Sequence, residues 1–174
     1  MTSRAYQTII IGGGHAGVEA AWAAANLLGS AGSVALVTLD PAKIGVMSCN
    51  PAIGGLAKGQ IVREVDALGG LMGLATDSTG IQFKVLNTSK GAAVHGPRAQ
   101  CDKHAYAEMV QALVRSRPEI EVVAGSVEDL LVEAGRVRGV VVRPGPLGAD
   151  GQAVEPGAAT CTGDSFLALT APSV

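Results

Sequence analysis

The feature that most constrains the fold is a glycine cluster placed between an apolar strand and an alanine-rich helix. Residues 8–11 predict a short buried strand, and residues 15–28 predict a helix. The pattern Gly12-x-Gly14-x-x-Gly17 joins them. In this context the first glycine permits a tight turn, the second lets a pyrophosphate approach the backbone, and the third lets the helix pack close to the strand. The sequence therefore predicts a dinucleotide-binding turn, and the alternative is a tight strand-to-helix connection without a ligand.

A second β-branched run follows the helix and completes a strand–helix–strand unit. Residues 33–39, SVALVTL, predict a strand parallel to the first. Dinucleotide-binding domains place an acidic residue for the ribose at the end of this strand, and Asp40 is the nearby candidate. Because the strand should stop near Thr38, Asp40 lies one or two residues too far along, so Thr38 or backbone groups are alternatives. The expected fold class is α/β, with a Rossmann-like parallel sheet.

The rest of the chain gives weaker signals. A long Gly/Pro-punctuated loop leads to a helical stretch near QIVREVDAL, and residues 80–104 are loop-like and polar. Asp102 is the expected N-cap of a helix in KHAYAEMVQALVRS. Residues 121–143 alternate strands around a hairpin turn at Ala134-Gly135. Residues 144–174 predict a weakly ordered tail rich in Gly, Pro and Ala, with at most one short strand, and it ends in FLALTAPSV without a clear strand partner.

Composition excludes several classes of function. The net charge of −2 lacks the basic bias of a self-sufficient nucleic-acid binder, so any contact with nucleic acid must be local. The three cysteines, Cys49, Cys101 and Cys161, contain no CxxC pair, which argues against a disulfide framework or a four-ligand zinc site. The histidines are not clustered with carboxylates, so no metal site is expected. No apolar run approaches the roughly 20 residues of a membrane helix, and we expect a cytoplasmic protein.

Several longer motifs in the right order carry a specific resemblance. They are IIIGGGHAGVEAA, MSCNPAIGGLAKGQIVREVDALGGLMG, GIQFKVLNTSKGAAVHGPRAQCDK and SVEDLLVE. Together they resemble the N-terminal FAD-binding portion of the MnmG family, also called GidA, the tRNA uridine 5-carboxymethylaminomethyl modification enzymes. The resemblance covers about residues 5–142. It implies a glutathione-reductase-like FAD-binding domain, with residues 1–143 as its N-terminal part and residues 144–174 as the tail.

The resemblance also implies a cofactor, partners and a reaction. Members of the family bind FAD, which NADH reduces through a domain absent here. With the GTPase MnmE they add an aminomethyl-type group to C5 of the wobble uridine of tRNA, taking carbon from methylenetetrahydrofolate. They are homodimers. By resemblance the FAD-binding residues of this chain are Gly12, Gly13, Gly14, His15, Ala16 and Gly17, with the backbone of Val127 at the adenine end.

The SCNPAIGG loop, Ser48 to Gly55, resembles the segment beside the flavin ring. Cys49 is then a candidate catalytic residue, because a thiolate can add to an electrophilic carbon. The alternative is a small buried thiol. The most cationic stretch runs from Lys84 to His104, and it is interpreted either as a contact for tRNA phosphate or a folate carboxylate or as a solvated loop.

The chain departs from the family pattern in length and in its last residues. Family members are several times longer, and TCTGDSFLALT replaces the turn that closes the adenine site. We interpret the chain as truncated, frame-shifted or a lone N-terminal fragment whose sheet lacks closing strands. It is therefore expected to bind FAD weakly or not at all, and not to modify tRNA alone. The alternatives are a generic FAD- or NAD-binding module and a non-catalytic interaction fragment.

Overall fold

The computed structural model describes residues 2–145 and 167–171. The chain divides into two compact units. The first unit comprises Met1–Ile44 and Arg117–Val174, and the second unit is the inserted segment Gly45–Ser116. None of the helices in the described residues has the length and apolar character needed to cross a lipid bilayer.

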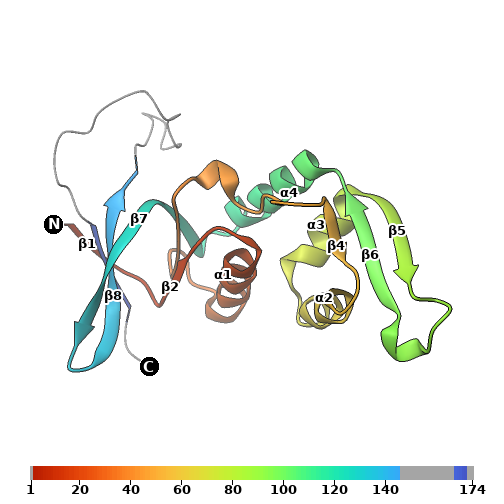
Figure 1. The fold of residues 1–174 in the computed structure, drawn as a ribbon. Coiled ribbons are helices and arrows are strands. Elements are labelled where there is room, and N and C mark those ends of the chain that lie inside the picture. Colours follow the sequence, from red (N-terminus) through yellow and green to blue (C-terminus); the bar gives the residue numbers. More distant parts are fainter. Residues whose placement is uncertain (1, 146–166, 172–174) are drawn as a thin grey trace. The chain divides into compact units, whose positions relative to one another are not determined.

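The first unit is built on one six-stranded sheet in the order β1-β9-β8-β7-β3-β2 (Figure 1). Strands β2, β3 and β7 are parallel, β8 is antiparallel to β7 and β9, and β1 is parallel to β9. Its elements are β1 (Thr2–Ala5), β2 (Thr8–Ile11), α1 (His15–Leu28), β3 (Val34–Thr38), the 3-10 turn η1 (Pro41–Lys43), β7 (Ile120–Glu133), β8 (Arg136–Pro144) and β9 (Leu167–Thr170).

The core of the first unit follows from the apolar pattern of its strands. All five residues of β3 are buried, as expected for a β-branched strand between two neighbours. Ala35 and Val37 pack in one cluster with Val140, Val142 and Leu169. This parallel arrangement is the Rossmann-type α/β fold that the glycine motif predicts, and the predicted strand end at Thr38 is confirmed.

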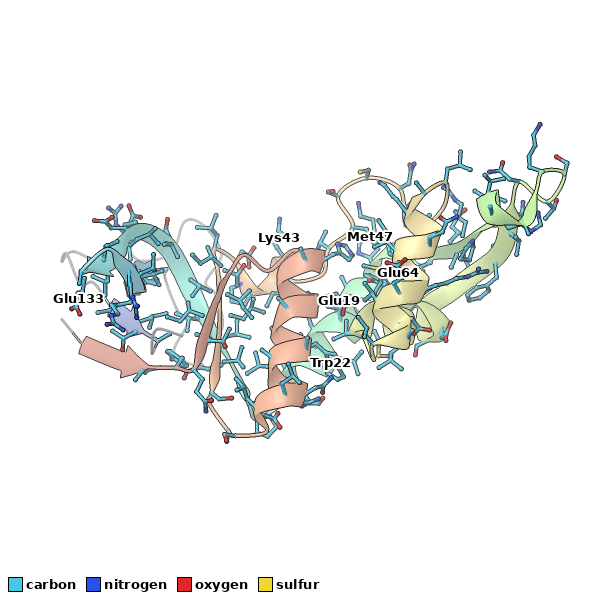
Figure 2. The ribbon with its side chains drawn as sticks, turned by 90° about the horizontal axis from the view of Figure 1, so that it is seen from below. Glu19, Trp22, Lys43, Met47, Glu64 and Glu133 are labelled. Atoms are coloured by element: carbon cyan, nitrogen blue, oxygen red, sulfur yellow. The ribbon has the colours of Figure 1, made fainter. Side chains whose placement is uncertain are left out.

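Helix α1 is held to the start of β7 by Arg117 (Figure 2 labels its partner Trp22 on α1). The guanidinium lies 4.9 Å from the centroid of the Trp22 ring and donates to Asn26 Oδ1 at 2.6 Å. It also pairs with Glu119 at 3.0 Å. Arg117 stacks on Trp22 and hydrogen-bonds to Asn26 at the same time. A lysine could not make both contacts, because it lacks the planar guanidinium group.

Strands β7 and β8 form the predicted hairpin. The turn residues Ala134 and Gly135 both have positive φ, 49° and 75°. Two positive φ values are the signature of the tight turn that matches the twist of a hairpin.

The last strand of the first unit differs from expectation. Leu167–Thr170 pairs with both β8 and β1, so residues 167–170 do have strand partners. Strand β1 is not predicted from the sequence, because Thr2–Ala5 has no alternating or continuous apolar pattern. The rest of the predicted tail, residues 146–166 and 172–174, lies outside the described residues.

The second unit packs helices on a three-stranded antiparallel sheet of order β4-β6-β5. Its elements are β4 (Ala52–Gly54), α2 (Lys58–Ala67), α3 (Leu71–Thr79), β5 (Gly80–Leu86), the 3-10 turn η2 (Ala92–Val94), β6 (Gly96–Cys101) and α4 (Lys103–Arg115). The expected N-cap of α4 is confirmed, since Asp102 Oδ1 accepts from the N–H groups of His104 and Ala105 at 2.9 Å.

The loop expected over residues 80–104 is wrong for most of its length. Strands β5 and β6 occupy Gly80–Leu86 and Gly96–Cys101 and pair with each other. The alternation Ile81-Gln82-Phe83-Lys84-Val85 was the available signal for β5. The strand was not predicted because the connection between the two strands, residues 87–95, is rich in turn-forming residues, and the whole segment was therefore interpreted as a loop.

Candidate functional site

The glycine cluster forms a sharp turn from β2 into α1. Strand β2 ends at Ile11, α1 begins at His15, and the N–H of Gly12 donates to Val37 O at 2.7 Å. Gly12 has φ +107°, a conformation that side chains disfavour. The turn is thus anchored to β3 and needs glycine at its first position.

Gly13 and Gly17 are required by close packing. A Cβ at Gly13 would lie 2.9 Å from Thr38 Oγ1 and from Ile44 Cγ1. A Cβ at Gly17 would lie 1.9 Å from the carbonyl oxygen of Gly12. Gly17 therefore performs the predicted task of bringing the helix against the turn.

Gly12 and Gly14 instead leave open space. A Cβ at either position would meet no atom within 4 Å, so a ligand could approach the backbone there. Gly14 is the N-cap of α1 and offers no side-chain cap, and the first turn carries no acidic residue. The unpaired N–H groups and positive dipole end of a helix favour an anion. The residues present therefore fit a pyrophosphate group.

His15 begins the helix and is half-buried. Desolvation lowers the pKa of its imidazole, and the nearby carboxylate of Glu19 offsets part of this effect. A lowered pKa keeps the ring neutral at pH 7 in the absence of a ligand.

The two ribose candidates at the end of β3 have local roles. Asp40 caps η1, because its Oδ1 accepts from the N–H of Ala42 at 2.9 Å. Thr38 Oγ1 donates to the Asp40 carbonyl oxygen at 3.5 Å and lies beside the position that a Gly13 side chain would take. The Asp40 carboxylate is thus engaged by its own turn, whereas Thr38 lies directly against the glycine turn.

Val127 belongs to β7 and pairs with Val142 of β8. Its side chain packs against the core cluster of the first unit, and the register shifts between Val127 and Asp129. A β-bulge of this kind frees backbone groups from the ladder.

Cys49 lies in the second unit and is exposed, with its Sγ 3.8 Å from Ser48 Oγ. Cys101 is buried in the same unit. Burial raises the pKa of the Cys101 thiol, and the neighbouring hydroxyl groups of Thr79 and Thr76 partly counteract this. Cys161 lies outside the described residues. Among the described residues no cluster of three or more His, Cys, Asp or Glu is arranged to hold a metal ion.

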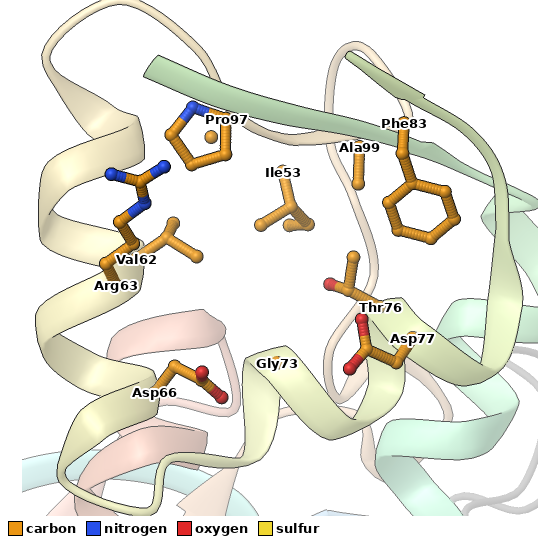
Figure 3. Close-up of a pocket in the computed structure, with 11 residues that line it drawn as sticks. Ile53, Val62, Arg63, Asp66, Gly73, Thr76, Asp77, Phe83, Pro97 and Ala99 are labelled. Carbon is orange, nitrogen blue, oxygen red and sulfur yellow. The ribbon is translucent and has the colours of Figure 1, made fainter. Parts of the chain in front are cut away.

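The second unit also has an open pocket of about 190 Å³ between the sheet and the helices α2 and α3 (Figure 3). Ile53, Phe83 and Ala99 form its apolar side. Thr76 is 6% exposed, and its Oγ1 makes no hydrogen bond of standard geometry in the described part of the chain. Sequence reasoning missed this pocket, because the strands that form it were not predicted.

Comparison with known proteins identifies relatives for most of the chain. The family model described as "Glucose inhibited division protein A" matches residues 7–155. The tRNA uridine 5-carboxymethylaminomethyl modification enzyme MnmG of Phocaeicola vulgatus is 54% identical over 136 residues, which is 78% of this chain and 21% of that protein. The enzyme of the same name from Granulibacter bethesdensis is 53% identical over 144 residues, 81% of this chain and 22% of that protein. The chain therefore spans about one fifth of the length of these relatives.

Solved structures agree with the sequence comparison. One structure of Aquifex aeolicus GidA is 50% identical, has a TM-score of 0.73, and is matched by 79% of this chain over 22% of its own length. A second crystal form gives 41% identity and a TM-score of 0.76, with 96% of this chain and 24% of that chain covered. The E. coli quinol fumarate reductase subunit FrdA, at 17% identity and a TM-score of 0.59, shares the fold alone.

Proposed function

Because the chain belongs to the glucose inhibited division protein A family, we propose that it is the FAD-binding part of a tRNA-modifying flavoprotein. Relatives that match it are named as enzymes of tRNA uridine 5-carboxymethylaminomethyl modification. The proposed reaction adds a carboxymethylaminomethyl-type group to C5 of the wobble uridine. Since the chain spans 21–22% of these relatives, it is expected to be inactive alone.

The observation that carries the proposal is the geometry of the glycine turn. Gly12 and Gly14 leave the backbone accessible at the positive end of α1, while Gly17 keeps the helix close to the turn. The residues from Gly12 to Gly17, including Gly13, His15 and Ala16, would hold the pyrophosphate of FAD. The backbone of Val127 would meet the adenine end. When bound, FAD supplies the two-electron redox chemistry that no side chain can supply.

Cys49 is the proposed catalytic residue for chemistry at the flavin or the uridine. Its exposure supports this role, because a reactive thiol must be accessible. Cys101 is a poor alternative, since it is buried and its thiol has a raised pKa.

The remaining partners are proposed by family resemblance. They are NADH as the reductant, acting through a domain that lies beyond the matched fifth of the relatives, methylenetetrahydrofolate as the carbon donor, the GTPase MnmE, and a second copy of the chain in a homodimer. The proposed location is the cytoplasm.

The test measures FAD binding at the glycine turn by NMR of the whole 174-residue chain. We choose NMR because amide shifts detect weak binding. Millimolar FAD should shift the backbone amide signals of Gly14 and Ala16, because its phosphates would lie at the start of α1. The negative phosphates should also raise the pKa of His15 from its lowered value.

The matched variants are Gly14→Ala and Gly91→Ala. Both glycines are N-caps with negative φ, −73° and −62°, and a Cβ at either meets open space. Gly14→Ala should weaken FAD binding by roughly tenfold, about 1.4 kcal/mol, whereas Gly91→Ala should not. FAD-induced shifts that Gly14→Ala leaves unchanged would overturn the proposal. A response to NADH but not to FAD would favour a generic NAD-binding module.

A further inference from the structure

The pocket of the second unit has an apolar wall on the side of the sheet. Strand register places Phe83 opposite Ala99 and Ala99 opposite Ile53, and all three residues line the pocket (Figure 3). Phe83 is 58% exposed, so its ring is accessible to a ligand. An apolar cavity of roughly 150 Å³ holds one benzene ring. The pocket volume of about 190 Å³ therefore suits a ligand built around a single small ring.

Charged side chains lie at two ends of this pocket. Arg63, Asp66 and Asp77 all line it. In Figure 3 the Arg63 guanidinium lies toward Pro97, whereas the carboxylates of Asp66 and Asp77 lie toward Gly73. Within the described residues neither carboxylate belongs to an ion pair. The end of the pocket toward Gly73 is therefore negative.

The positions of the two carboxylates on their helices increase this negative potential. Asp66 lies in the last turn of α2, and Asp77 lies in the last turn of α3. Neither helix has a basic residue in its last turn. Because the C-terminal end of a helix dipole is negative, each carboxylate adds to the dipole and a cation is favoured beside it.

The hydroxyl group of Thr76 supplies a further acceptor at this end. Thr76 is 6% exposed, and in the described part of the chain its Oγ1 makes no hydrogen bond of standard geometry, although the Cys101 thiol is a neighbour. Figure 3 shows this oxygen directed into the pocket. A buried polar atom without a partner is costly, and a ligand that donates to Thr76 would remove that cost.

We propose that this pocket binds a small primary amine whose apolar body is about the size of a benzene ring. A protonated primary amine has three N–H donors and no acceptor, which matches the three acceptors Asp66, Asp77 and Thr76. The apolar body then packs on the wall formed by the strands. A negatively charged ligand is disfavoured, because two carboxylates line the pocket against one guanidinium.

The experiment titrates the whole 174-residue chain with benzylamine at neutral pH, without FAD, and follows the amide signals of Thr76 and Phe83 by NMR. Three comparison probes separate the two parts of the ligand. Benzyl alcohol has the ring without the charge, methylammonium has the charge without the ring, and benzoate has the opposite charge. Benzylamine should bind in the millimolar range and roughly tenfold more tightly than each comparison probe.

Asp77 is the carboxylate to vary, because Asp66 also packs against α3, where a Cβ at Gly73 would overlap its Oδ1. Asp77→Asn should weaken benzylamine binding roughly tenfold and leave benzyl alcohol binding unchanged. The matched control is Glu64→Gln, which removes the same charge from the last turn of α2 at an exposed residue outside the pocket lining. It should bind benzylamine as the unaltered protein does.

Thr76→Val removes the hydroxyl group and keeps the shape of the side chain. It should weaken benzylamine binding several-fold without lowering the Tm, because a hydroxyl group that lacks a partner does not stabilise the fold.

Several results would overturn the proposal. They are no shift with benzylamine, equal affinity for benzylamine and either benzyl alcohol or methylammonium, tighter binding of benzoate, and equal losses in Asp77→Asn and Glu64→Gln. The pocket and the glycine turn lie in different units, and the titration contains no FAD. The result is therefore independent of the proposed function.

Discussion

At the scale of single residues, the glycines of the turn answer two different demands. Gly17 is required for packing, because a Cβ at this position would lie only 1.9 Å from the carbonyl oxygen of Gly12. Gly14 leaves space that nothing in the described protein fills. Stability and ligand binding are therefore separable within one short motif.

Gly17→Ala should destabilise the first unit by about 1–3 kcal/mol, because the added methyl group displaces α1 or distorts the turn. Urea unfolding followed by tryptophan fluorescence measures this, since Trp22 lies on the same helix. Gly14→Ala serves as the control and should lower the unfolding midpoint less, because a Cβ at this N-cap position meets open space. Equal stability of Gly17→Ala and the unaltered protein would show that the helix is not held as closely as described.

The two described cysteines should differ in reactivity. Iodoacetamide at pH 8 should alkylate Cys49 well before Cys101, because Cys49 is exposed whereas Cys101 is buried and the pKa of its thiol is raised. Mass spectrometry of the peptides that contain each cysteine gives the two rates separately. In urea the two rates should converge, and Cys101 reacting as fast as Cys49 in the native protein would contradict its burial.

At the scale of secondary-structure elements, α4 depends on its N-cap. Asp102→Ala should lower the Tm, because the N–H groups of His104 and Ala105 lose their acceptor. These two backbone hydrogen bonds lower the pKa of the Asp102 carboxyl. Asp102 therefore binds a proton less readily in the folded state than in the unfolded state.

The sign of the pH dependence follows from that lowered pKa. The stabilisation is complete above the unfolded pKa, near pH 4, and is lost as the pH falls through the folded value. The Tm difference between the unaltered protein and Asp102→Asn should thus shrink below about pH 4. Asp77→Asn, which alters an exposed carboxylate within α3, is the control and should show no comparable change. A Tm difference that is independent of pH would contradict a charged cap.

The elements that could be predicted from sequence are those with strong local signals. The strand–turn–helix of residues 8–28, strand β3 and the β7–β8 hairpin have apolar runs or turn residues that act over short distances. Helix α3 was missed because Gly73 and the Thr residues within Leu71–Thr79 have low helix propensity, so tertiary packing stabilises it. The position of Lys84 opposite Arg98 could not be predicted either, because the register between two strands can be assigned only when it is known which strands pair.

At the scale of the whole molecule, the chain is a matched fifth of much longer relatives. We expect no modified wobble uridine when the chain is incubated with tRNA, FAD, NADH, methylenetetrahydrofolate and MnmE. Mass spectrometry of nucleosides from the digested tRNA measures the product. A full-length relative is the positive control, and detection of modified uridine with this chain alone would show that the remaining four fifths are dispensable.

The insertion of the second unit into the first has a consequence for biosynthesis. Residues 45–116 form one continuous segment and are synthesised before any part of β7. The second unit can therefore fold while β3 still waits for the strand at Ile120 and β1 for the strand at Leu167. In the nascent chain β1 therefore has no strand partner until residue 167 is made, and β3 has only β2 beside it until Ile120 is made.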